Sequence, residues 1–162
     1  MILRCTAKVL TLVKPASLAE APPSDDDWYA NTFPIRRRKC LLLTHAETLF
    51  SVVVPNVVVS RLRPPGPLVV DHVKAAVQRE QLPPDVFGDL DASDVYPART
   101  ADRRVLGVMT DHRYVVELAT DQRGGLGEEN IDGLHHRLHR HITLSKGTAY
   151  PIDLVRSKLD SS

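Results

Sequence analysis

Two strand-like runs with a very short connection constrain the fold more than any other feature of the chain. The runs are Cys40–Thr44 and Thr48–Val54, and both are apolar nearly throughout. Two such runs separated by three residues predict a β-hairpin. Strands that lack polar alternation are typical of a sheet whose two faces are both covered. We therefore expect helices to pack over this hairpin.

The rest of the chain supplies those helices and further strands. Apolar residues at helical spacing predict helices over Ala7–Val13, Leu68–Leu82 and Ala101–Thr120, a helix that begins at Glu128, and a last helix over Ile152–Leu159. Strands are predicted over Ile2–Thr6 and Trp28–Ile35 and briefly at Val95 and Tyr96, with Pro97–Thr100 as a link. The expected fold is α+β, a small, mainly antiparallel sheet with a central hairpin, packed by four or so helices.

Length and composition exclude several classes of protein. The 162 residues correspond to one domain, residues 1–162, in which the prolines and acidic run of residues 14–27 predict a solvated loop. Lys and Arg (21) balance Asp and Glu (20), so the chain is neither polybasic nor acidic. No apolar stretch approaches the ~20 residues of a membrane span, and no secretory signal is seen. Cys5 and Cys40 lack a CxxC spacing and are expected to be reduced structural thiols in a cytoplasmic protein.

Basic residues gather in places despite the neutral total. One run, residues 36–39, lies between two predicted strands, and a second group surrounds a helix start that Thr100 is predicted to cap. Arginines beside the N–H groups of a helix N-terminus suit phosphate. The candidates for binding phosphate or nucleic acid are Arg4, Arg36, Arg37, Arg38, Lys39, Arg99, Thr100, Arg103 and Arg104. The alternative is that each cluster is a solvated turn or pairs with an acid such as Asp102.

Histidines and one aspartate are the remaining candidates for chemistry. His135 and His139 stand at i, i+4, a spacing that lets two imidazoles face one metal. A third ligand is not evident, so the favoured interpretation is a solvated helix face, and no cofactor is predicted. Asp111 falls within a helix among apolar neighbours, where a structural ion pair and a catalytic role both remain open.

Several strings resemble one family. The chain opens with MILRCTAKVL, continues with DWYAN at Asp27–Asn31, and later reads RVLGVMTDH at Arg104–His112. These strings resemble an uncharacterised bacterial family catalogued as a domain of unknown function, whose members carry an LRCTxKLL-like opening, WYAN and an SRSVLGSMNDF-like motif. The resemblance implies a single bacterial cytosolic domain and no assigned activity. The chain departs from the family pattern at Thr110 and His112, where Asn and Phe are usual.

Three functional hypotheses follow. The first is a non-enzymatic binding or regulatory module, antitoxin-like or defence-associated, that recognises a partner protein or the phosphates of a nucleic acid. The second is a small enzyme acting on a phosphorylated substrate or nucleic acid, with Arg103 and Arg104 as phosphate clamp and Asp111 as base or metal ligand. The third is a structural protein that dimerises through its sheet. Few aromatics, 5% of the chain, argue against a base-stacking surface, and the sequence does not indicate an oligomeric state.

Overall fold

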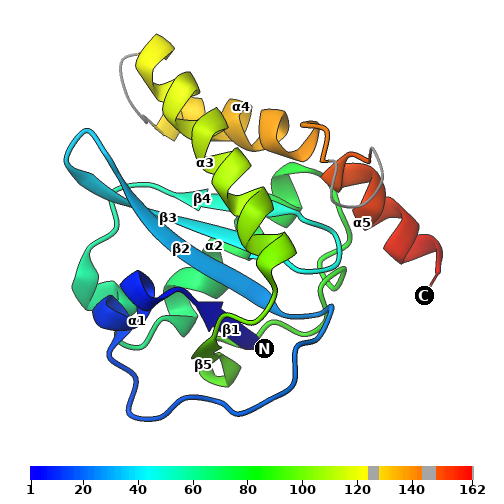
Figure 1. The fold of residues 1–162 in the computed structure, drawn as a ribbon. Coiled ribbons are helices and arrows are strands. Elements are labelled where there is room, and N and C mark those ends of the chain that lie inside the picture. Colours follow the sequence, from blue (N-terminus) through cyan, green and yellow to red (C-terminus); the bar gives the residue numbers. More distant parts are fainter. Residues whose placement is uncertain (124–127, 144–148, 162) are drawn as a thin grey trace.

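The computed structural model describes residues 1–123, 128–143 and 149–161. One five-stranded sheet has the strand order β4-β3-β2-β1-β5, with helices on both faces (Figure 1). The strands are β1 (Ile2–Cys5), β2 (Trp28–Ile35), β3 (Arg38–His45), β4 (Ser51–Val54) and β5 (Tyr96–Arg99). The helices are α1 (Ala7–Val13), α2 (Gly66–Arg79), α3 (Arg103–Arg123), α4 (Glu128–His139) and α5 (Pro151–Asp160), and two short 3-10 helices, η1 (Val59–Leu62) and η2 (Ala92–Asp94), lie between them.

The α+β class and the mostly antiparallel sheet are confirmed. β2, β3 and β4 form successive antiparallel pairs, and β3 and β4 are the hairpin that the two apolar runs predicted. β1 pairs in parallel with both β2 and β5. The predicted link at Pro97–Thr100 is wrong, because residues 96–99 form strand β5. A proline is tolerated there because β5 lies at the edge of the sheet.

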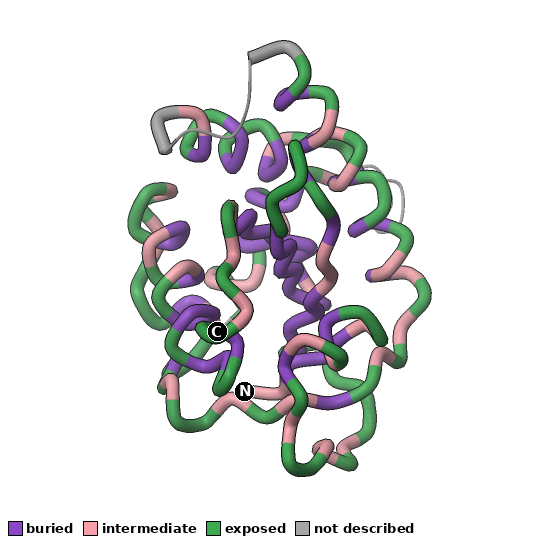
Figure 2. Tube along the Cα trace, turned by 90° about the vertical axis from the view of Figure 1, so that its left-hand side faces the viewer, coloured by how far each residue is buried: buried purple, intermediate pink, exposed green. Residues whose placement is uncertain are grey.

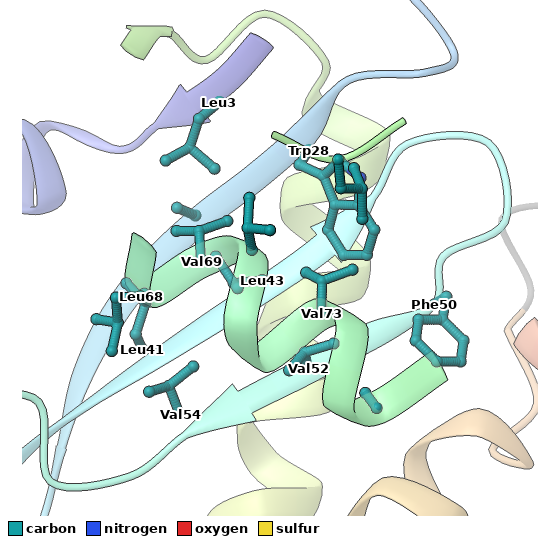
Figure 3. Packing of buried hydrophobic residues seen from close by; sticks show 14 of the residues in the cluster. Leu3, Trp28, Leu41, Leu43, Phe50, Val52, Val54, Leu68, Val69 and Val73 are labelled. Carbon is teal, nitrogen blue, oxygen red and sulfur yellow. The ribbon is translucent and has the colours of Figure 1, made fainter. Parts of the chain in front are cut away.

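Each face of the sheet has its own apolar core, as the unbroken apolar strands predicted. α1 and α2 cover one face, where Val69 and Val73 of α2 pack on Leu3, Leu43 and other strand residues (Figure 3). α3 and α4 cover the other face over Phe33, Leu42 and Val53. Buried positions accordingly follow the strands and the inward sides of the helices (Figure 2).

The two outer strands have their backbone edges occupied by other parts of the chain. At β5, the Ala19 N–H donates to the carbonyl of Pro97 at 2.8 Å, so the segment after α1 runs along this edge. At β4, side chains of α4 bond the backbone of Ser51 and Val53. Unpaired strand edges are sites of unwanted association, and both outer strands are covered in this way.

Two local expectations are corrected. The N-cap of α3 is Asp102 rather than Thr100, because the Asp102 Oδ1 accepts from the Arg104 N–H at 2.7 Å. The loop over residues 14–27 is mostly exposed, but Asp27 at its end is buried by an ion pair with Arg4. Within the described part of the chain, no helix has both the length and the apolar character needed to cross a bilayer.

Candidate functional site

The β2–β3 hairpin projects past its neighbours and carries the basic run at its tip. The last β1 partner of β2 is Ala30, and the last β4 partner of β3 is Leu41, so the ribbon beyond them has two strands only. Its inner face, with Phe33, Ile35 and Cys40, is buried against α3 and α4. The four residues of the tip, Arg36, Arg37, Arg38 and Lys39, are all exposed.

The turn of this hairpin holds two arginines in an unfavourable backbone conformation. Ile35 pairs with Arg38, which leaves Arg36 and Arg37 as a two-residue turn with φ values of 46° and 67°. Such turns favour Asn-Gly because both central residues need positive φ, and an ordinary L-residue there costs roughly 1–2 kcal/mol. A residue held in a strained conformation is a reason to look for function. Within the described residues, Arg37, Arg38 and Lys39 form no ion pair.

The second basic group lies apart from the hairpin. Arg99 and Arg103 are exposed at the end of β5 and the start of α3, and Arg104 pairs with Asp102 at 3.2 Å. The ribbon meets α3 further along, where the Arg113 guanidinium lies 5.3 Å from the centre of the Phe33 ring. Ten residues of helix, about 15 Å, separate that contact from Arg103. The structure therefore does not bring the two groups into one patch.

Arg4, a candidate phosphate ligand from the sequence, has its guanidinium engaged within the fold. Its side chain is 5% exposed, and Nε donates to Asp27 at 2.8 Å. The terminal nitrogens donate to the carbonyls of Ala21, Pro22 and Arg99. Arg4 thereby ties β1, the loop before β2 and the end of β5 together. A guanidinium buried with its donors engaged is not available to an anion.

The histidines of α4 were expected on a solvated face, and this interpretation is wrong for His135 and His139. Both are buried, because they face the open edge of β4. The Val53 N–H donates to Nε2 of His135 at 2.8 Å. Nε2 of His139 donates to the carbonyl of Ser51 at 2.7 Å. The i, i+4 pair of imidazoles thus supplies hydrogen-bond partners to the outer edge of β4, where a further strand would otherwise bind.

His139 continues into an ion pair on its other side. Nδ1 lies 2.8 Å from the Glu80 carboxylate, which Arg140 also contacts at 3.0 Å. The hydrogen bond from His139 is the main reason that the pKa of Glu80 falls from 4.5 to about 2, and Arg140 adds to it. Because a carbonyl and an ionised carboxylate can only accept, both nitrogens of His139 donate. Glu80, at the end of α2, thereby connects the two faces of the molecule.

A third buried histidine completes this cluster from α3. His112 Nδ1 lies 2.8 Å from the Ser51 hydroxyl, which also contacts the Thr44 hydroxyl at 2.7 Å. Burial lowers the pKa of His112 from 6.5 to about 3, with smaller contributions from the charges of His141 and His139. Burial is also the main cause of a fall in the pKa of His135 to about 3. Both rings are therefore neutral at ordinary pH.

The geometry of the cluster suits a packing role better than catalysis or metal binding. Both nitrogens of His139 are used by protein acceptors, so the pair does not offer two lone pairs to one cation. No group of three or more potential metal ligands occurs among the described residues. Ser51 is fully buried. Asp111 is exposed on the outer side of α3 and has no hydrogen bond or ion pair with the described residues.

The burial of these histidines could have been predicted from the sequence if the apolar stripe of α4 had been taken to include the neighbouring helical positions. On α4, the buried positions Leu134 and Leu138 are each followed by a buried histidine. Apolar stripes of globular helices span i, i+3, i+4, i+7 and i+8, so His135 and His139 extend the stripe that begins at Ile131. Ile142 lies beyond the end of α4 and is 46% exposed.

The fold and site define an α+β protein whose mixed sheet carries a projecting basic hairpin and a histidine-capped edge. The chain belongs to a family described as a domain of unknown function, DUF6933, whose model matches residues 2–154. This match confirms the family resemblance seen in the sequence. Comparison with the curated proteins and with the solved structures found no match.

Proposed function

We propose that this protein is a non-enzymatic binding module that holds the phosphate backbone of a nucleic acid with the tip of the β2–β3 hairpin. The observation that carries the proposal is the cluster of four consecutive exposed cations on a projecting ribbon. Lys and Arg that approach phosphates release condensed counterions, which supplies most of the affinity for nucleic acid. A two-stranded ribbon also has the width that the major groove of duplex DNA admits.

The strained turn supports the same role. Asn-Gly would tolerate the positive φ of these two positions better than Arg36 and Arg37 do. The two arginines therefore lower the stability of the turn, and a function for their charge would explain why they are there. The only aromatic residue of the ribbon, Phe33, is buried. Contact with bases by stacking is therefore not expected, and recognition through phosphates without sequence preference follows.

The cellular role follows from the same surface. A small module that binds nucleic acid without catalysis fits a regulator of the antitoxin-like or defence-associated kind. Cys5 and Cys40 are free and buried, and burial raises the pKa of each thiol to about 12. Unreactive free thiols agree with a cytoplasmic location.

The enzymatic alternative has less support from the geometry. It needs Arg103 and Arg104 to hold a phosphate while Asp111 acts as base or metal ligand. Arg104 is engaged with Asp102, and Asp111 lies about two helical turns further along α3, roughly 10 Å away. Catalytic groups are typically in a cleft with a perturbed environment, whereas Asp111 is exposed.

Salt-dependent binding tests the proposal. Fluorescence anisotropy with a labelled duplex of about 20 base pairs is measured from about 50 to about 200 mM salt. The triple variant Arg37→Gln, Arg38→Gln, Lys39→Gln should lower the slope of log affinity against log salt by up to about 2.7, since each phosphate contact contributes about 0.9. A matched control removes three exposed cations elsewhere, with Lys8→Gln, Lys74→Gln and Arg137→Gln.

Two outcomes would overturn the proposal. One is no binding at the lowest salt, to duplex DNA or to RNA. The other is an equal loss in the hairpin variant and the control variant, which would mean that only net charge matters. Far-UV circular dichroism of both variants checks that the fold is intact, and turnover of a phosphorylated substrate that depends on Asp111 would favour the enzyme instead.

A further inference from the structure

A cleft between α1 and β5 is separate from both the basic hairpin and the histidine cluster. It has a volume of about 430 Å³, within the range of small-molecule sites. Four segments meet there: the end of α1, the extended residues that follow it, the turn after η1 and the start of β5 (Figure 1). The cleft is lined by residues 13–19, 63–65 and 95–97.

The walls of this cleft are apolar and preorganised. Prolines 15, 64, 65 and 97 come from three different segments, and their fixed φ limits how far the walls can relax. The Tyr96 ring is half exposed, and its hydroxyl donates to the Asp94 carboxylate at 3.1 Å, which orients the ring. The segment that forms one wall is held by the bond from Ala19 to Pro97. A ligand would therefore meet a shaped surface at a small cost in ordering.

Two cations line this apolar surface, and neither is paired with an acid among the described residues. Lys14 is exposed and ends α1 with a φ of 49°. The Arg63 guanidinium is placed by its Nε, which donates to the Leu12 carbonyl at 2.8 Å, and its remaining donors are not used within the described residues. Neither cation forms an ion pair with a described residue, and no acidic residue is among the described residues that line the cleft.

We propose that this cleft binds a small organic carboxylate with an apolar or aromatic body. The guanidinium fork of Arg63 matches a carboxylate, Lys14 adds a second positive charge, and the proline and Tyr96 surfaces take the body of the ligand. This site is separate from the basic hairpin, because none of residues 36–39 lines it. The binding module would thereby carry a ligand site of its own on the far side of the sheet from α3 and α4.

Titration of the ¹⁵N-labelled protein, followed by NMR of its backbone amides, tests this assignment. The probe is 3-phenylpropionate, added up to about 10 mM because a single weak site of this kind has a Kd near the millimolar range. The neutral isostere 3-phenylpropionamide is titrated in parallel. We expect saturable shifts of amide resonances confined to residues 13–19, 63 and 95–96. The amide should bind at least about threefold more weakly, because it lacks the negative charge and an ion pair with an exposed cation contributes only modestly to binding.

Charge variants separate this site from nonspecific binding. Lys14→Gln and Arg63→Gln should each weaken binding about three- to tenfold, while Lys8→Gln, which removes an exposed lysine from the same helix outside the cleft, should not. Arg63→Lys keeps the charge and controls for the loss of the bond to Leu12. No saturable shift, shifts that map elsewhere, equal affinity for the amide, or unchanged affinity in Lys14→Gln would each overturn the proposal.

Discussion

Acid should destabilise this protein well above the pH at which carboxylates titrate, because it folds around neutral histidines. His135 accepts a hydrogen bond from the Val53 N–H through Nε2, and this bond needs the unprotonated ring. His112 is fully buried, and its Nε2 has no partner among the described residues. The pKa of both rings falls from the usual 6.5 to about 3, chiefly through burial.

The size of the effect follows from proton linkage. Between pH 6.5 and 3, the unfolded chain binds a proton at each of these histidines and the folded chain does not, so stability falls as pH falls. Each histidine contributes about 1.4 kcal/mol per pH unit, and the two together about 2.7 kcal/mol. From pH 6.5 to 5 the free energy of unfolding should drop by about 3 kcal/mol, because the unfolded histidines are only half protonated at pH 6.5. This is a large part of the typical 5–15 kcal/mol.

Replacing one histidine isolates its share of this slope. His135→Gln keeps an oxygen that can accept from Val53 but cannot titrate, so the mean slope between about pH 5 and 6.5 should fall by about 1.1 kcal/mol per pH unit. Urea unfolding between about pH 5 and 6.5, above the range of the carboxylates, is followed by the fluorescence of Trp28, the single tryptophan, which is buried. The neighbouring His136 is exposed, and His136→Gln should leave the slope unchanged.

Two results would refute this reasoning. If His135→Gln shows the slope of the original chain, the ring is not neutral in the folded state. If His136→Gln lowers the slope as much, the effect belongs to the helix and not to burial. The absolute stability of His135→Gln at neutral pH does not enter the test, because the comparison is between slopes.

Two further predictions concern stability near neutral pH. Glu80→Gln should lower the free energy of unfolding by about 3 kcal/mol, because it leaves His139 and Arg140 without their shared carboxylate. The control Asp132→Asn removes an exposed ion pair with Arg79 and should cost no more than about 0.5 kcal/mol. The pKa of Glu80 falls from 4.5 to about 2, so its carboxylate stabilises the folded state fully above pH 4.5. The difference in stability between the original chain and Glu80→Gln should therefore disappear as the pH falls through 2. Gly66→Ala should cost at least about 2 kcal/mol in urea unfolding, since a Cβ there would lie 1.9 Å from the Ala92 carbonyl oxygen. Gly107→Ala, which meets nothing within 4 Å, should stabilise α3 by about 0.5–1 kcal/mol, and the opposite order of the two glycine variants would contradict both statements.

Local patterns predicted most of the elements because those elements are determined locally. The bounds of β2 match the predicted Trp28–Ile35, and Pro151 begins α5 as a first-turn proline should. Only the first residue of β5, Tyr96, was predicted to be in a strand, because the pairing partner β1 lies far away in the sequence and Pro97 masks the strand signal. A strand formed by long-range parallel pairing leaves little trace in its own residues.

The candidate site was predicted only in part. Arg36 and Arg37 lie between two strands as predicted, whereas Arg38 and Lys39 are the first residues of β3. The position of this run at the projecting tip depends on how far β1 and β4 extend. Arg4 could not be assigned from sequence, because its acceptors lie on a loop whose path no periodicity reveals. His112 could have been found, since it lies three residues after Met109 and seven after Val105, both on the buried stripe of α3.

The arrangement of the sheet edges bears on how this protein can associate. Dimerisation through the sheet would need free backbone groups at β4 or β5. At β4, Val53 and Ser51 are bonded by imidazoles, and at β5 the Pro97 carbonyl is occupied and its nitrogen carries no hydrogen. Adding a strand at either edge would first break these bonds, and each bond lost opposes the new pairing by about 0.5–1.5 kcal/mol. We therefore expect this protein to associate with partners through side chains rather than through the sheet edges. Exposed positive charge is concentrated at the strained tip of the β2–β3 hairpin.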